Sequence, residues 1–115
     1  MIRKFLRSFR FAFSGIKMGM KERNMRIHII CGIIAILAGF LSHLSAVEWL
    51  ILILTIALVI GMEMVNTAIE NVVDLVSPEY HPLAKIAKDV AAGAVLVVAI
   101  ASVLIGLILF VPKWF

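Results

Sequence analysis

Of the 115 residues in this chain, 63% are hydrophobic, 16% are charged, and the net charge at pH 7 is +4. The length suits one small domain, but a water-soluble domain of this size cannot hide so much apolar surface. The composition therefore excludes the soluble globular class and predicts that most of the chain faces lipid or another membrane helix. Eight of the eleven basic residues precede Ile27: Arg3, Lys4, Arg7, Arg10, Lys17, Lys21, Arg23 and Arg26. Beside a membrane segment, such an arm favours anionic headgroups, and we expect no nucleic-acid partner.

Residues 1–26 are predicted to form a helix that lies on the membrane surface. Apolar side chains recur mostly at steps of three and four, which describes one helical face: Ile2, Phe5, Leu6, Phe9, Phe13, Ile16 and Met20. Basic side chains occupy most of the other face, and aromatic residues opposite a basic face are typical of a helix in the headgroup plane. A soluble helix packed on a partner is the alternative.

Three later apolar runs can each cross the membrane as a helix. The runs cover about 27–45, 47–76 and 88–111, the last ended by Pro112. At 1.5 Å per residue each reaches across a hydrocarbon core of about 30 Å, the first only just. The segment Ser77–Lys88 contains two prolines and is predicted to be a loop. We therefore expect an all-α integral membrane protein, with residues 1–115 forming one membrane-embedded domain.

The basic residues also predict the topology. They lie in the N-terminal arm and in the second connection, residues 77–88, whereas the link Ser42–Ser45 has neither Lys nor Arg. Positive residues stay inside, so we expect a multi-pass protein of the cytoplasmic membrane with its N-terminus in the cytoplasm and Lys113 outside. Small residues along the third run, such as Gly93 and Gly106, allow close helix approach and predict an interior or subunit-contact helix.

A polar stripe continues the second apolar run. Its side chains fall within about a 100° arc of a helix; they are Glu63, Asn66, Thr67, Glu70 and Asp74. Glu63 lies about fourteen residues past Trp49, which is roughly 21 Å into the hydrocarbon core. Carboxylates are expensive at that depth and persist mainly where a site uses them. The stripe is expected to descend from the cytosol into the inner leaflet, where a water-soluble reactant can meet a lipid-borne one.

Three alternatives compete with a chemical role for this stripe. Asp74 and Glu70 also fit a solvated helix end, and the carboxylates fit structural pairing with Lys85, Lys88 or the basic arm. Glu63 also fits the proton-relay carboxylate of a small transporter. A proton-relay carboxylate is expected near the middle of the bilayer, whereas these acidic residues lie closer to one face of it.

The residues alone support a cytoplasm-facing site with acid and base groups. Glu22, the only acid of the arm, fits a helix cap or an ion pair; with Glu70 it can also hold Mg²⁺, which takes one or two carboxylates and leaves positions for phosphate oxygens. Lys88 can neutralise phosphate charge, and Glu63 can accept a hydroxyl proton. No Gly-rich phosphate loop occurs, so these residues by themselves do not identify ATP. His28 is assigned no role.

Two motifs give the chain a specific resemblance. Residues 63–74 follow the pattern E-x-x-N-[ST]-A-x-E-x-x-x-D, and the groups Glu79-Tyr80-His81 and Lys88-Asp89 come after it. With them, nearly the whole chain resembles the prokaryotic diacylglycerol kinase family, small membrane kinases with a surface helix and three spans. Residues 21–25, 70–75 and 110–114 are similar to its Gram-positive branch, whose members are undecaprenol kinases. His28 stands where the diacylglycerol branch has a second acid, which makes diacylglycerol the less expected substrate.

The resemblance implies transfer of the γ-phosphate of ATP to undecaprenol, giving undecaprenyl phosphate; a diacylglycerol kinase making phosphatidic acid is the alternative. It implies that Glu63 is the catalytic base, that Glu22 and Glu70 bind Mg²⁺, and that Asn66 and Lys88 orient and neutralise the phosphates. The ATP contacts it implies are Glu22, Glu70, Glu79, Tyr80, His81, Lys88 and Asp89. Members of the family form homotrimers with sites shared between subunits, so a homotrimer is implied here.

Overall fold

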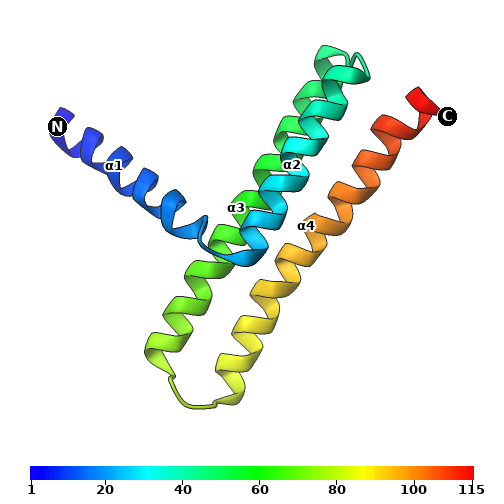
Figure 1. Ribbon diagram of the computed structural model, residues 1–115. Coiled ribbons are helices and arrows are strands. Elements are labelled where there is room, and N and C mark those ends of the chain that lie inside the picture. The colour runs from blue at the N-terminus through cyan, green and yellow to red at the C-terminus, as the bar shows by residue number, and fades with distance from the viewer.

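The computed structural model describes all residues 1–115 and consists of four α-helices (Figure 1). They are α1 (Ile2–Gly19), α2 (Arg23–Leu41), α3 (Ala46–Val76) and α4 (Pro82–Trp114). By length and composition, α2, α3 and α4 can each cross a membrane. The predicted fold class, an all-α membrane protein with an N-terminal helix and three spans, is confirmed.

Helix α1 runs away from the other three helices at a steep angle (Figure 1). Gly19 is its only buried residue, and the rings of Phe5 and Phe9 touch edge to face with centroids 4.9 Å apart. A detached helix with an aromatic face and a basic face suits the headgroup layer. The helix is shorter than the predicted 1–26. Residues 20–22 turn the chain, and residues 23–26 belong to α2 because Met25, 2% exposed, is buried in the bundle.

A capping box starts α3. The backbone N–H of Glu48 donates to Ser45 Oγ at 3.2 Å, and the N–H of Ser45 donates to Glu48 Oε1 at 3.0 Å. This reciprocal pair satisfies two backbone donors that the first helical turn leaves free. The link before it includes His43, which has a φ of 52°. Helices α2 and α3 are therefore joined by a tight connection.

Helix α4 begins at Pro82, so the prediction that residues 77–88 all form a loop is wrong for 82–88. Proline at the first helical position has no backbone donor to lose there. The preceding His81 accepts a hydrogen bond at Nδ1 from the N–H of Leu83, at 3.1 Å. The two residues together start the helix six residues before Lys88.

Helix α4 also continues through Pro112, which was predicted to end it. Proline removes one backbone hydrogen bond inside a helix, and contacts with the α2–α3 link and with the first turn of α3 stabilise this last turn despite the loss. Trp114 Nε1 donates to Ser42 Oγ at 2.8 Å, and Lys113 Nζ lies 3.1 Å from Glu48 Oε1. These contacts place the C-terminus at the same end of the bundle as the α2–α3 link.

Helices α3 and α4 pack antiparallel and extend beyond the start of α2 (Figure 1). Helix α2 has 19 residues, about 28 Å, whereas α3 has 31 residues, about 46 Å. The projecting half of the α3–α4 hairpin therefore lies past the level at which α1 leaves the bundle. In this single chain only Ala91 and Leu109 are buried on α4, so the prediction of an interior or subunit-contact helix stays a prediction.

Gly39→Ala is expected to destabilise the bundle by about 1–3 kcal/mol, the usual cost of overpacking. An added Cβ would stand 2.8 Å from Trp49 Cη2 and 3.1 Å from Leu44 Cδ1. The Trp49 ring has little room to yield because it packs on Phe40, with centroids 4.8 Å apart. Thermal unfolding in detergent measures the effect. Gly61→Ala is the control, because its Cβ meets nothing within 4 Å; equal unfolding temperatures for the two variants would contradict the packing argument.

Candidate functional site

Glu63 is buried inside the bundle, 3% exposed, and does not face lipid. Its Oε2 lies 3.5 Å from Nε2 of His28, one turn into α2. Helix α2 begins at Arg23, five residues before His28. The contact therefore places Glu63 about 8 Å from the end of the bundle where α1 is attached. An acidic side chain costs about 3 kcal/mol at the centre of a spanning helix, so its position between helices with an ionisable partner indicates a use.

Asn66 and Glu70 continue the same face of α3. Asn66 is 6% exposed, and its Nδ2 donates to Glu70 Oε1 at 3.2 Å. The Asn66 Oδ1 atom is buried and has no hydrogen-bond partner. Thr67 Oγ1 donates to the backbone carbonyl of Glu63 at 3.1 Å, so it does not hold the carboxylate. An unpartnered buried acceptor is rare and marks a place where a ligand or cation can bind.

A cleft lies at the far end of this face, between α3 and the start of α4. Its volume is about 390 Å³, and it is lined by most of the residues predicted to contact nucleotide: Glu79, Tyr80, His81, Lys88 and Asp89, together with Asp74. Residues that are fifteen positions apart in the sequence are thus brought into one polar cleft. The fold therefore joins the loop after α3 with the first turns of α4.

Two ion pairs line this cleft. Lys88 Nζ pairs with Asp74 Oδ1, and Lys85 Nζ lies 2.6 Å from Asp89 Oδ2. The alternative that Asp74 pairs with Lys88 is therefore confirmed as a contact. All four side chains are well exposed, and exposed pairs contribute at most about 1 kcal/mol. Such weak pairs can open when a phosphate competes for the lysines.

Glu22 occupies the corner between α1 and α2. It precedes the first residue of α2, yet its side chain makes no capping hydrogen bond and belongs to none of the chain's four ion pairs. The two structural roles considered for it are therefore absent. A Cβ added at nearby Gly19 would lie 3.6 Å from the Met64 side chain, so this corner lies beside the turn of α3 that contains Met64. That turn is about 9 Å along the helix axis from Glu70.

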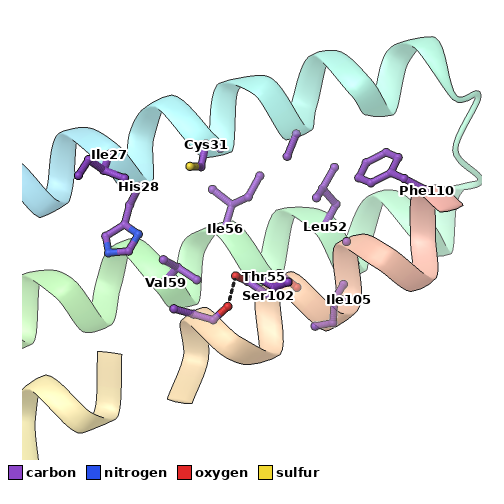
Figure 2. Close-up of a pocket in the computed structure, with 15 residues that line it drawn as sticks. Ile27, His28, Cys31, Leu52, Thr55, Ile56, Val59, Ser102, Ile105 and Phe110 are labelled. Atoms are coloured by element: carbon purple, nitrogen blue, oxygen red, sulfur yellow. Dashed lines mark hydrogen bonds between the residues drawn. The ribbon is translucent and has the colours of Figure 1, made fainter. Parts of the chain in front are cut away.

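An apolar groove of about 390 Å³ runs between α2, α3 and α4 (Figure 2). Figure 2 shows Ile27 and His28 at one end and Leu52 and Phe110 toward the other, with the His28 ring directed toward α3. His28 therefore contacts Glu63 and also lines the groove. No role at the site was predicted for His28, although two signals marked it: an ionisable side chain within an apolar run, and its place where the diacylglycerol branch has a second acid.

Residues 10–110 match a family model whose description is "prokaryotic diacylglycerol kinase". The chain belongs to this family. It is 45% identical to the undecaprenol kinase of Bacillus subtilis, over 97% of this chain and 92% of that protein. It is 50% identical to the diacylglycerol kinase of Synechocystis, over 91% of this chain but 61% of that protein, and 30% identical to the Escherichia coli diacylglycerol kinase, over 82% and 78%.

Membership of this family makes the protein a membrane lipid kinase and confirms the predicted resemblance. It favours a kinase over the transporter considered as an alternative for Glu63. The roles of individual residues remain predictions.

Proposed function

We propose that the protein transfers the γ-phosphate of ATP to the hydroxyl of undecaprenol, giving undecaprenyl phosphate. One observation carries the proposal: a single face of α3 joins an exposed polar cleft to a buried carboxylate whose partner lines an apolar groove. The cleft suits a nucleotide, and the groove suits a hydrocarbon chain. The Bacillus subtilis relative, similar over almost the full length of both chains, is an undecaprenol kinase.

The proposed setting is the cytoplasmic membrane, with the N-terminus and the site on the cytoplasmic side. Eight basic residues precede Ile27 and would lie inside, whereas the link Ser42–Ser45 has none. With α1 in the headgroup layer, Glu63 lies just below the surface and the cleft lies in water, where ATP is available. A homotrimer is part of the proposal, and the surface of α4, on which only Ala91 and Leu109 are buried, suits a subunit contact.

In the proposed reaction, Glu63 accepts the proton of the lipid hydroxyl while that oxygen attacks the γ-phosphorus. The O–H bond breaks, a new O–P bond forms, and the bond from the γ-phosphorus to the β-phosphate oxygen breaks to leave ADP. Asn66 orients the phosphoryl group from the buried face of α3. Lys88 leaves Asp74 and neutralises charge on the phosphates from the cleft side.

The residues around Glu70 fit Mg²⁺, a cation that prefers oxygen ligands. Glu70 supplies a carboxylate, and the unpartnered Oδ1 of Asn66 supplies a second oxygen beside it. Mg²⁺ is usually held by one or two carboxylates together with the phosphate oxygens of a substrate. Glu22 is proposed as the second carboxylate. When bound, Mg²⁺ would supply positive charge that offsets the negative charge of the phosphates.

Diacylglycerol is the second candidate substrate, because the Synechocystis relative, 50% identical, is a diacylglycerol kinase. A two-lipid assay decides between the substrates. Purified protein in mixed micelles receives ATP, Mg²⁺ and either undecaprenol or diacylglycerol, and ADP release is measured. We expect ADP release that depends on lipid and is faster with undecaprenol.

Faster turnover of diacylglycerol would reverse this choice of substrate and leave the kinase class intact. Absence of lipid-dependent ADP release, together with ion flux in liposomes, would contradict the kinase and restore the transporter alternative. Protein with Glu63→Gln serves as the matched blank for contaminating ATPases, since it keeps the shape of the site and removes the proposed base.

A further inference from the structure

The one ionisable side chain in contact with the Glu63 carboxylate comes from another helix. Its only ion-pair partner in the chain is His28, whose Nε2 lies 3.5 Å from Oε2, and the two side chains are 19% and 4% exposed. The polar neighbours on α3 make other contacts, since Asn66 Nδ2 donates to Glu70 and Thr67 Oγ1 donates to a backbone carbonyl. His28 is therefore the only polar side chain that contacts this carboxylate.

His28 also lies where the lipid alcohol would arrive. Its ring lines the apolar groove beside Ile27 and Cys31 on α2, and it points toward α3 at that end of the groove (Figure 2). One residue therefore contacts both the buried carboxylate and the apolar space. The 3.5 Å separation is longer than the about 2.7–3.2 Å of an N–H···O hydrogen bond, and catalytic contacts often shorten to that range only when substrate binds.

We propose that His28 is a positioning residue whose Nε2–H donates to Glu63 Oε2 and leaves Oε1 directed at the lipid hydroxyl. The inference rests on the proposed function, since Glu63 is the base there. The hydroxyl proton still passes to Glu63, and His28 takes no part in bond making or breaking. It acts by holding the carboxylate in one geometry, and a misplacement of about 1 Å in such a geometry costs on the order of a hundredfold in rate.

Two substitutions of nearly equal length test this role. His28→Gln places an amide N–H near the position of Nε2, whereas His28→Met fills similar space without a donor. We expect His28→Gln to keep kcat within about threefold of the unaltered protein, and His28→Met to lower kcat at least tenfold with the KM for ATP unchanged. Equal kcat values for the two variants would overturn the proposal. Binding of a fluorescent Mg·ATP analogue checks that each variant is folded.

A third variant covers the case in which His28→Met is not recovered folded. His28→Asn keeps an amide, but its N–H lies near the position of Nδ1 and does not reach Glu63. We expect it to lose activity like His28→Met, and retention of kcat by His28→Asn would contradict the proposal. His43→Asn, the same change at the opposite end of α2, is the control, since Asn tolerates the φ of 52° there.

The contact itself has a readout that does not depend on activity. The ¹⁵N signal of His28 Nε2 in the unaltered protein should change when Glu63 is replaced by Gln, and the His43 signal should not. An unchanged His28 signal would overturn the contact, whatever the enzyme does. If the signal changes but no lipid drives ADP release, the proposed function fails while the pairing stands.

Discussion

Glu63→Gln is expected to abolish lipid phosphorylation while the protein still folds and binds Mg·ATP. Glutamine has the shape of the buried carboxylate but cannot take up the hydroxyl proton. General-base assistance contributes about 10²–10⁴-fold, so turnover should fall by that factor. Folding should not suffer, because a neutral amide is less costly than a carboxylate at this depth. Lipid-dependent ADP release and binding of a nucleotide analogue, measured on one preparation, separate the two effects.

Glu48→Gln is the matched control for that experiment, since it makes the same change near the other end of α3. Glu48 pairs with Lys113 and completes the capping box, far from the cleft. Turnover of this variant should stay close to that of the unaltered protein. Near-full activity of Glu63→Gln would remove Glu63 from the base role, and equal losses in both variants would point to a general effect of disturbing α3.

The number and order of the helices could be predicted because hydropathy and side-chain period are local properties. A run such as 47–76 has to be helical in lipid, where backbone groups find no water. The helix ends were less predictable. Trp114 and Ser42 are joined by a hydrogen bond across 72 residues, and no local pattern reveals that this contact supports a helix through Pro112.

The polar stripe on α3 could also be predicted, because the spacing of its residues along a helix is a local property. Spacing alone puts Glu63, Asn66 and Glu70 on one face of α3, and the fold shows the first two buried. The His28 contact depends on how α2 and α3 are aligned against each other, which is a property of the packed bundle. The same holds for Asp74 and Lys88, which meet only because the α3–α4 hairpin closes. Sequence therefore indicated the face of the site, and tertiary structure supplied its partners.

Glu70→Gln is expected to lower activity by about 10²–10³-fold, the usual effect of losing one preorganised charge-stabilising group. The amide oxygen can still accept the hydrogen bond from Asn66 Nδ2, so the local structure should persist. What disappears is the negative charge that would hold Mg²⁺ beside the phosphates. The variant should therefore respond more weakly to Mg²⁺ and need a higher concentration for half-maximal activity.

A Mg²⁺ titration at saturating ATP and lipid distinguishes this role from a structural one. Asn66→Asp in the Glu70→Gln protein provides a rescue, because it returns a carboxylate to the position of the unpartnered Oδ1. If Glu70 and Asn66 together face the cation, the double variant should recover part of the Mg²⁺ response that Glu70→Gln loses. An unchanged titration in Glu70→Gln would rule out direct ligation by Glu70, and Glu22 would remain as the proposed carboxylate ligand.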